Sequence, residues 1–252
     1  MTHILAALLL SFQFSAPPSL TPVSVLPDDI KPTYRAHSPP ECGNWRGARS
    51  GKDQESRLRL GVYRMWVLGY ITGFNVTGPD KTGDLLGTAP HEEVYSAIDG
   101  YCARNPSHSV VDSMRPIAAA FIRRRLGSLT AVAPPAGEKR RAMVVQPSPC
   151  RDWVRGRGNA ILRLAYVGML RGYLTAHNRW SSDPAGDAIG ADDEPLIENA
   201  IEDWCGKQPS SLLIGAVNPL IDHVKAERAE GRLPPGGLRP NEKFTPGSPP
   251  QP

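Results

Sequence analysis

Hydrophobic positions that recur every three or four residues dominate two stretches of the chain and predict two long helices. In residues 54–74, apolar and small side chains follow one stripe of a helix. The stripe consists of Leu58, Val62, Met65, Trp66, Gly69 and either Thr72 or Gly73. Residues 159–177 repeat this pattern. The period-two alternation typical of strands is scarce, so we expect an all-α fold.

A second helix is predicted to follow each long one. In the first half of the chain it covers residues 89–104. Pro106 ends this helix, as Pro209 ends its counterpart, because the residue before a proline is disfavoured in helical conformation.

The third helix in each half is predicted from its cap and its charge. Ser107 and Ser210 suit its N-cap, and basic residues near its end suit the negative pole of the helix dipole. Pro116 and Pro219 fall inside these helices and are expected to kink them.

These helices belong to a repeat that covers most of the chain. The segment GYITGFN at 69–75 matches GYLTAHN at 172–178 when the sequence is displaced by 103 residues. Further pairs align at the same displacement without a gap, including Tyr63 with Tyr166, Asp80 with Asp183, Cys102 with Cys205 and Pro116 with Pro219. Upstream, CGNW at 42–45 matches CRDW at 150–153, a displacement of 108 residues. We interpret the chain as a tandem duplication of one helical unit.

The duplication sets the domain organisation. We predict a signal peptide at 1–16, a disordered flank at 17–41, helical unit one at 42–126, a linker at 127–149, helical unit two at 150–230 and a disordered tail at 231–252. Each unit is close to the lower size limit for a self-sufficient core. The flanks and the linker contain much of the proline, 26 residues in the whole chain, and are too Pro-rich to join a packed core.

The extreme N-terminus predicts export. Residues 4–16 form an apolar run with the length of the hydrophobic region of a secretory signal, too short to span a bilayer. A retained membrane anchor and a cytoplasmic location are the alternatives, because no Lys or Arg precedes the run. No other stretch is long and apolar enough for a membrane span, so we expect a periplasmic or secreted mature chain.

Four cysteines occupy equivalent places, two in each unit. Cys42 and Cys102 are 60 residues apart, and Cys150 and Cys205 are 55 residues apart, unlike the short C-x-x-C spacing of zinc and redox sites. In an exported protein this arrangement predicts one disulfide within each unit. Four buried free thiols, or a four-thiolate metal site between the units, are the alternatives.

The repeated segment contains six residues that we call the repeat signature: Tyr70, Thr72, Asn75, Tyr173, Thr175 and Asn178. Gly69 and Gly73, like their counterparts, lie four positions apart and let another helix approach closely. We expect these small residues to be buried within their own unit, with contact between the units as the alternative. The two asparagines are placed to end the long helices. A surface that binds a ligand through the repeat signature is the competing interpretation.

Residues that support catalysis or metal binding are sparse. None of the six histidines occupies the same position in both units, and the chain has no Gly-rich phosphate loop and no G-x-S-x-G motif. Asp80 and Asp84 recur as Asp183 and Asp187, in a spacing that suits a turn better than a calcium loop. NVT at 75–77 fits a glycosylation sequon. We predict a protein that is not an enzyme and needs no cofactor or metal.

Charge distinguishes the two units. Unit one contains 12 Lys or Arg against 8 Asp or Glu, a net +4, whereas unit two contains 9 against 12, a net −3. The opposite signs favour attraction between the units. Arg123, Arg124 and Arg125 are typical of a solvated helix end, since a nucleic-acid patch would need more basic residues interleaved with aromatics. We expect no nucleic-acid partner.

Several residues that recur in both units support a resemblance to known families: Cys42, Trp45, Gly69, Tyr70, Asn75 and Cys102, with their counterparts. In these residues each unit resembles the HdeA/HdeB family of periplasmic acid-stress chaperones. More loosely, the units are similar to the Tai-type immunity proteins that neutralise type VI secreted amidases. The resemblance implies a small disulfide-tied helical fold that binds proteins. The chaperones are single units, whereas this chain has two units and long Pro-rich flanks.

Two functions from different classes follow. The first, which we expect, is a stress chaperone that exposes apolar surface when its carboxylates are protonated and then binds unfolding clients. The second is an inhibitor or immunity protein that binds one partner protein with its native surface. In either case we expect the units to pack together as an internal pseudo-dimer, because related chaperones work as homodimers and a tandem chain supplies both members.

Overall fold

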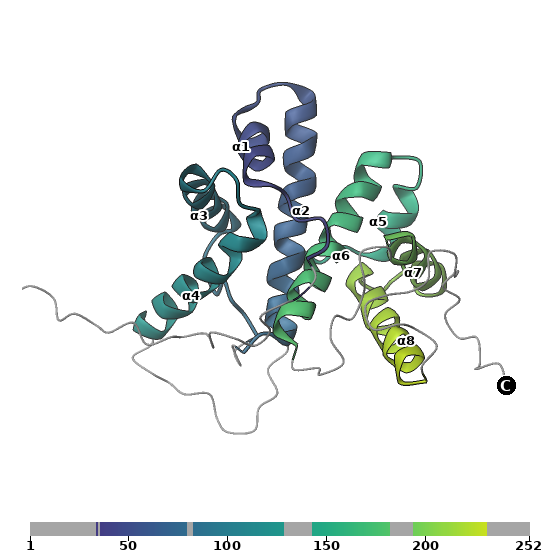
Figure 1. Ribbon diagram of the computed structural model, residues 1–252. Coiled ribbons are helices and arrows are strands. Elements are labelled where there is room, and N and C mark those ends of the chain that lie inside the picture. Colours follow the sequence, from purple (N-terminus) through teal and green to yellow (C-terminus); the bar gives the residue numbers. More distant parts are fainter. Residues whose placement is uncertain (1–33, 35, 80–82, 129–142, 182–193, 231–252) are drawn as a thin grey trace, which may run out of the picture.

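The protein consists of helices joined by loops. The structure is a computed structural model that describes residue 34 and residues 36–79, 83–128, 143–181 and 194–230 (Figure 1). These parts of the chain contain helices and two isolated β-bridges, so the expectation of an all-α fold is confirmed. The predicted signal peptide, the predicted tail and most of the repeated aspartates lie outside the described residues.

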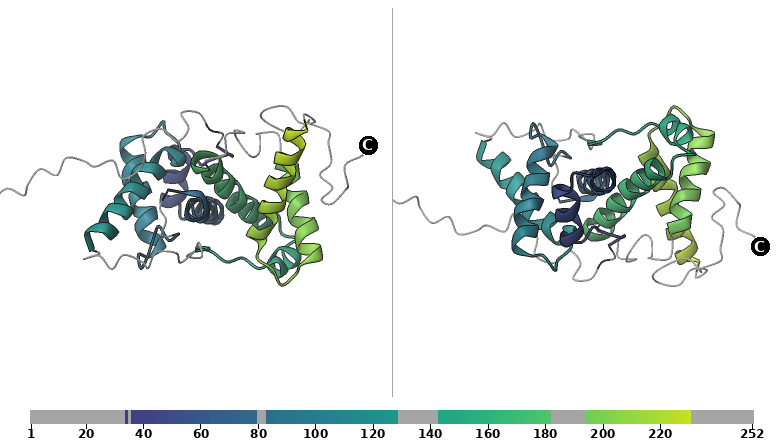
Figure 2. Two further views of the ribbon diagram at one scale, coloured as in Figure 1. Left: turned by 90° about the horizontal axis from the view of Figure 1, so that it is seen from below. Right: turned by 90° about the horizontal axis from the view of Figure 1, so that it is seen from above.

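Both units follow the same order of helices. Unit one contains α1 (Cys42–Ser50), α2 (Gln54–Thr77), α3 (His91–Arg104) and α4 (Val110–Ser128). Unit two contains α5 (Cys150–Arg155), α6 (Ala160–Trp180), α7 (Glu194–Lys207), the 3-10 helix η2 (Leu213–Ala216) and α8 (Val217–Ala229). Figure 2 shows α2 and α6 at the centre, with α3 and α4 on one side and α7 and α8 on the other.

The two long helices start where the hydrophobic pattern predicts, each behind a polar cap. The Asp53 side chain accepts a hydrogen bond from the Ser56 backbone N–H at the start of α2. The Asn159 side chain accepts from two backbone N–H groups, including that of Ile161, at the start of α6. These caps satisfy N–H groups that have no partner within the helix.

The ends of the long helices differ from the prediction. α2 runs to Thr77 and α6 runs to Trp180, three residues beyond the predicted ends. Asn75 and Asn178 therefore lie inside the helices, and the expectation that they end them is wrong. Their side chains bond to other segments of the chain, as described below, and the backbone continues past them.

The third helices begin later than predicted. α4 starts at Val110, and the Asp112 carboxylate accepts a hydrogen bond from the Ser109 N–H just before it. In unit two, η2 precedes α8, so Pro219 lies in the first turn of α8. A proline there removes no helical hydrogen bond, so the physical reason for a kink is absent. Pro116 lies inside α4, and the helix continues through it.

Two short helices that the pattern did not predict contain the first cysteine of each unit. The disulfides Cys42–Cys102 and Cys150–Cys205 join α1 to α3 and α5 to α7, as predicted, and no cysteine is free. The chain-entropy estimate gives ~4 kcal/mol of stabilisation for loops of this length. That amount is comparable to the whole stability of a small domain.

Each unit has a buried core, and the two cores share the pair of long helices. The core of unit one includes Ala176 and Trp180 of α6, while Met65 of α2 packs against the core of unit two. The Trp180 ring meets the Phe74 ring edge to face, with 5.1 Å between the ring centroids. The C-terminal halves of α2 and α6 thus belong to one apolar assembly.

Gly69 and Gly172 form the closest approach between the long helices, which run in the same direction (Figure 1). A Cβ atom on Gly69 would lie 1.8 Å from the Met169 carbonyl oxygen, and one on Gly172 would lie 1.9 Å from the Trp66 carbonyl oxygen. No side chain fits there, so both positions require glycine. The expectation that these glycines are buried within their own units is wrong, because each glycine packs directly against the backbone of the other unit's long helix.

Candidate functional site

The repeat signature is buried where α2 meets α6. The exposed fractions of its side chains are Tyr70 0%, Thr72 2%, Asn75 5%, Tyr173 3%, Thr175 0% and Asn178 0%. An accessible ligand surface at these six positions is therefore a wrong interpretation. They pack between the units instead.

Two stretches predicted to be disordered also pack against the long helices. We call residues 36–41 and 143–149 the lead-in segments, because they enter α1 and α5. His37 is 6% exposed, and its carbonyl oxygen accepts a hydrogen bond from the Trp66 indole N–H at 2.9 Å. The prediction that the Pro-rich flank and linker stay out of the packed structure is wrong for these residues, since the long helices pair with their backbone polar groups.

The threonines of the repeat signature hold these lead-in segments. Thr72 Oγ1 accepts a hydrogen bond from the Val145 N–H at 3.2 Å, and Thr175 Oγ1 accepts one from the His37 N–H at 2.9 Å. His37 and Val145 each lie five residues before the first cysteine of their unit. The threonine of each unit therefore holds the lead-in segment of the other unit.

The asparagines of the repeat signature also bond to segments that pack against the long helices. Asn75 Oδ1 accepts a hydrogen bond from the Leu85 N–H at 2.8 Å, and its Nδ2 donates to the Met143 carbonyl at 3.0 Å. Asn178 Nδ2 lies 3.2 Å from His37 Nε2. Because the Asn75 amide is buried and bonded at both of its ends, the sequon at this residue is not accessible to glycosylation in the folded chain.

The tyrosines of the repeat signature are held neutral. Tyr70 Oη accepts a hydrogen bond from the Trp180 indole N–H at 2.9 Å. Burial raises the pKa of Tyr70 to about 12, and burial likewise raises the pKa of Tyr173 to about 12. Neither phenol can act as a base near neutral pH, so the contact between the long helices is structural.

The N-terminal halves of α2 and α6 diverge (Figure 1). Residues from both halves line an open groove. Its volume is about 580 Å³, and residues Gln146–Ser148 of the second lead-in segment also line it. Its apolar lining comes from α2, α3 and α6: Leu58, Val62, Met65, Leu68, Tyr95, Ile161, Leu162, Ala165 and Tyr166. Leu58 is 36% exposed, Ile161 40% and Leu162 43%, which is unusual for large aliphatic side chains that lie together.

Polar side chains surround this apolar lining. Arg57, Arg64, His91 and Asp152 line the groove as well. Arg64 is partly neutralised by Glu92, at 3.3 Å. The groove therefore offers apolar contact in its lining and mostly positive charge at its edge.

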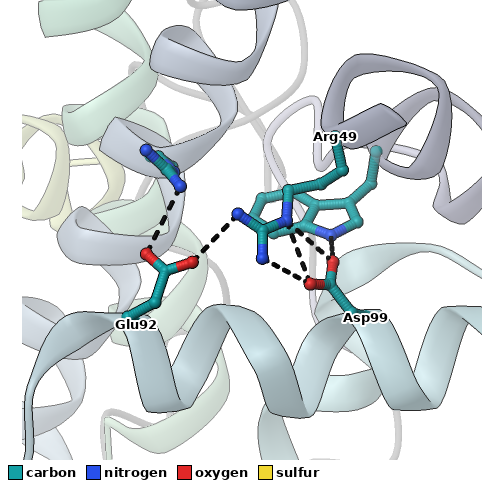
Figure 3. Close-up of polar contacts among 5 residues, drawn as sticks. Arg49, Glu92 and Asp99 are labelled. Carbon is teal, nitrogen blue, oxygen red and sulfur yellow. Dashed lines mark hydrogen bonds and ion pairs between the residues drawn. The ribbon is translucent and has the colours of Figure 1, made fainter. Parts of the chain in front are cut away.

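A network of charged residues ties α1, α2 and α3 together (Figure 3). The Asp99 carboxylate accepts hydrogen bonds from the Trp45 indole N–H at 2.7 Å and from the Arg49 guanidinium at 2.6 Å. Glu92 bonds to Arg49 at 3.0 Å and to Arg64. Hydrogen bonding to Asp99 raises the pKa of Arg49. Since donors occupy both oxygens of Asp99, this carboxylate holds helices together and has no free lone pair directed at a substrate.

The counterpart of this network in unit two is smaller. Arg157 and Glu202, displaced from Arg49 and Asp99 by 108 and 103 residues, form an ion pair at 2.7 Å. The Trp153 indole N–H is buried, and within the part of the chain that the structure describes it has no hydrogen-bond partner. Unit two thus repeats the ion pair without the indole bond.

A second open pocket, of about 570 Å³, lies at the start of α4, and its lining includes His108 and two serines, Ser107 and Ser109. The Tyr101 hydroxyl lies 2.8 Å from His108 Nδ1, whereas the Ser109 hydroxyl bonds to Asp112. A nucleophilic serine needs a bond to its histidine base. Ser109 bonds to the carboxylate, and within the described chain neither Ser109 nor Ser107 bonds to the His108 ring, so the arrangement of a serine relay is not formed here.

The described residues supply neither a metal cluster nor a membrane helix. Among them, no three His, Cys, Asp or Glu side chains lie close enough to hold a metal ion. None of their helices combines the length and the apolar character needed to cross a bilayer.

Comparison with known proteins gives no family for this chain. No family model matches it, and neither a curated protein nor a solved structure does. The groove between α2 and α6 is therefore the candidate functional site on its own geometry. The repeat indicates it only in part, because Leu58 recurs as Ile161 at the displacement of 103 residues, whereas Leu162 corresponds to Arg59. The available signal was the run AILRL at 160–164, whose apolar residues extend beyond one helical stripe.

Proposed function

We propose that this chain is a non-enzymatic, exported binding protein that holds an apolar segment of another protein in the groove between α2 and α6. The observation that supports the proposal best is the joint exposure of Leu58, Ile161 and Leu162 in one concavity of the native fold. Covering what remains exposed of these three side chains would contribute about 2 kcal/mol. That is less than the roughly 4 kcal/mol of a millimolar complex, so the partner has to add polar contacts.

A role without catalysis agrees with the state of the reactive groups. Asp99 is occupied by its donors, Ser109 bonds away from His108, and Tyr70 and Tyr173 are buried. None of these groups is free to activate a bound substrate in the way that general acid–base catalysis requires.

A photo-crosslinking amino acid in place of Leu162 tests the groove directly. At neutral pH, in the cells that make the protein, we expect it to form crosslinks to a small set of proteins. Leu164 is the matched control, since it is 48% exposed on the same helix and does not line the groove. Equal crosslinking from both positions, or none from Leu162, would contradict the proposal.

Export is supported by two independent features. Disulfides such as those of units one and two persist in oxidising compartments. The apolar run at 4–16 predicts a cleaved signal. N-terminal sequencing of the protein from the periplasmic or culture fraction is the test, and a cytoplasmic protein that retains residues 1–16 would contradict export.

We also propose that the chain is a tandem duplication whose two units pack as an internal pseudo-dimer. Support comes from contacts between the units that occur in equivalent pairs, related by the displacement of 103 residues. Gly69 meets Met169, and Gly172 meets Trp66, so each contact is the counterpart of the other, as in a two-fold interface. Small-angle scattering should give one compact particle at low and high salt. Two separate particles joined by a tether would contradict it.

The acid-stress chaperone implied by the resemblance to HdeA/HdeB is the second candidate. One observation favours it: carboxylates hold the outer helices, through Arg49–Asp99 to α3 and Arg157–Glu202 to α7. Protonation in acid removes these charges and would loosen both helices from their cores. The glycines, tyrosines and threonines between α2 and α6 have no carboxylate, so acid would open the units before it separated them.

A pH series separates the two candidates. Suppression of client aggregation at pH 7, with near-UV circular dichroism unchanged, would favour binding in the native groove. Suppression that begins only where the near-UV signal is lost in acid would favour the chaperone. Absence of both activities, together with absence of crosslinks from Leu162, would contradict the protein-binding function.

A further inference from the structure

Charge is concentrated at the end of the molecule that contains the groove. Residues 42–64 and 150–164, which form α1, α5 and the starts of α2 and α6, contain ten Lys or Arg and three Asp or Glu. Figure 1 shows these elements together around the diverging ends of the two long helices. Residues 194–230 have the opposite balance, with three Lys or Arg and seven Asp or Glu. The groove therefore lies in the positive part of the protein.

Several of these cations have no carboxylate of their own. Arg46, Lys52, Arg151 and Arg155 are exposed, and none of them lies within ion-pair distance of a described carboxylate. Arg57 lines the groove, is exposed, and donates a hydrogen bond to the Lys52 carbonyl rather than to a carboxylate. Their positive charge is thus available to a ligand.

We propose that the groove binds an acidic amphipathic helix of a partner protein. This inference rests on the proposed function and names the chemistry of the partner. The apolar face of such a helix would enter between Leu58 and Leu162, and its flanking carboxylates would meet Arg57, which lines the groove within the positive end of the molecule. A volume of about 580 Å³ holds a few side chains of one helical face.

Other anionic ligands fit these observations less well. An anionic bilayer offers the same charge, but its surface is flat, whereas Leu58 and Leu162 line a concavity. A single-stranded nucleic acid would use exposed aromatic platforms for its bases. Of the two tyrosines that line the groove, Tyr95 is 5% exposed and is covered by the Arg64 guanidinium, which leaves Tyr166. An acidic helix matches both the shape and the charge.

Three labelled helical peptides of identical length and identical leucine positions test the proposal with the full chain. Their remaining positions are mainly Glu in the first, Gln in the second and Lys in the third. Fluorescence anisotropy should show the Glu peptide binding at least about tenfold more tightly than the Gln peptide. The difference should shrink in about 0.5 M salt, because salt screens exposed charges.

Two substitutions separate the apolar from the charged contribution. Leu162→Ser should weaken binding of all three peptides, whereas Arg57→Glu should remove only the preference for Glu, by about fivefold or more. Leu164→Ser and Arg123→Glu are matched controls, on exposed positions outside the groove lining, and should change neither. Far-UV circular dichroism checks folding, and Arg57→Gln is the milder variant if Arg57→Glu fails to fold.

The outcomes distinguish this proposal from the proposed function. If the three peptides bind equally and Leu162→Ser still weakens their binding, the proposal of an acidic partner is wrong. The proposal that the groove binds apolar segments would then still hold. No binding of any peptide would count against both. Binding to phosphatidylserine vesicles that depends on Arg57, with no binding of the Glu peptide, would overturn the acidic helix in favour of a membrane surface.

Discussion

The two units differ most in how firmly the short first helix is held to the outer helix. In unit one, Asp99 binds both the Trp45 indole and Arg49, and Glu92 extends the network to α2. In unit two, the corresponding tie is the ion pair of Glu202 with an arginine, and the Trp153 N–H is buried without a described partner. An aspartate in one unit is replaced by a longer glutamate in the other, and only the aspartate bonds to the indole.

The difference shows which part of the fold has fewer polar contacts between its helices. Unit two, with the weaker tie, also provides most of the exposed apolar surface: Val154, Ile161, Leu162 and Leu164 belong to it, against Leu58, Val76 and Met143 elsewhere in the described chain. One wall of the groove therefore belongs to the unit whose first helix has the weaker polar connection, although Arg163 of α6 still forms an ion pair with Glu198 of α7 at 2.6 Å. A wall that can adjust suits a surface that accommodates a partner.

The largest expected effect comes from breaking the contact that the units share. Gly69→Leu should destabilise both units by about 3 kcal/mol or more, because the new side chain meets the Met169 backbone and cannot avoid it by rotation. Gly172→Leu should do the same from the other side. Urea unfolding and scattering measure both. Gly61→Ala is the control on α2, where a Cβ meets nothing within 4 Å. A native compact particle with Leu at position 69 would contradict the contact.

Alkaline pH should weaken the contact between α2 and α6, where Tyr70 and Tyr173 are buried. The folded chain holds the pKa of Tyr70 and Tyr173 at about 12, above the value of 10.0 for a free phenol. Folding therefore favours the protonated form, and stability is complete below pH 10 and falls between pH 10 and 12. The loss is up to about 3 kcal/mol for each tyrosine. Urea midpoints measured from pH 8 to 12 test this, and a constant midpoint would contradict it.

Replacing each of these two tyrosines by phenylalanine compares their contributions to stability in the two units. Tyr173→Phe should remove part of the alkaline loss with little effect at pH 8. Tyr70→Phe should remove a similar part but cost about 1 kcal/mol at pH 8, because the Trp180 indole N–H loses its acceptor. Equal stability of the two variants at pH 8 would show that the hydrogen bond to Trp180 contributes nothing.

Removing the carboxylate that bonds to the arginine in each unit should destabilise unit one more than unit two. Asp99→Ala should cost about 2 kcal/mol, since it leaves the buried Trp45 indole N–H without an acceptor and Arg49 without its main partner. Glu202→Ala should cost about 0.5 kcal/mol, as for a partly exposed ion pair. Urea unfolding is the measurement, and equal losses would show that both units are tied equally.

The smallest effect concerns the two indoles. Trp45→Phe and Trp153→Phe remove the same volume, but only the first breaks a hydrogen bond, to Asp99. We expect Trp45→Phe to be the more destabilising by about 1 kcal/mol. The same substitutions in the Asp99→Ala background complete a double-mutant cycle, in which this difference should disappear.

Some of this structure could be predicted from the sequence, for physical reasons. α2 and α6 have strong helical periodicity, and the cysteines stand at equivalent positions, so the long helices and both disulfides were predictable. α1 and α5 are too short for periodicity to be visible. The lead-in residue His37 lies in a Pro-rich stretch, and its bonds to Trp66, Thr175 and Asn178, all distant in sequence, hold it in the packed structure.

The candidate site was less accessible to sequence analysis. The repeat directed attention to Tyr70, Thr72 and Asn75, because matching residues in both units suggested a shared role. That role is packing between the units, which requires similarity. The groove combines one recurring pair, Leu58 and its counterpart Ile161, with Leu162, whose counterpart is Arg59. Comparison of the units therefore identifies only part of the groove.

The crossing of the lead-in segments also sets an order of events while the chain is being made. Trp66 can bond to His37 of its own unit's lead-in segment as soon as α2 has been made, but the backbone that covers Gly69 belongs to α6, about a hundred residues later. At roughly 5–20 residues per second, ribosomal synthesis leaves that face of α2 uncovered for about 5–20 s. Cys42 and Cys102 can meet within this interval, yet the first unit is finished only when the second has been synthesised.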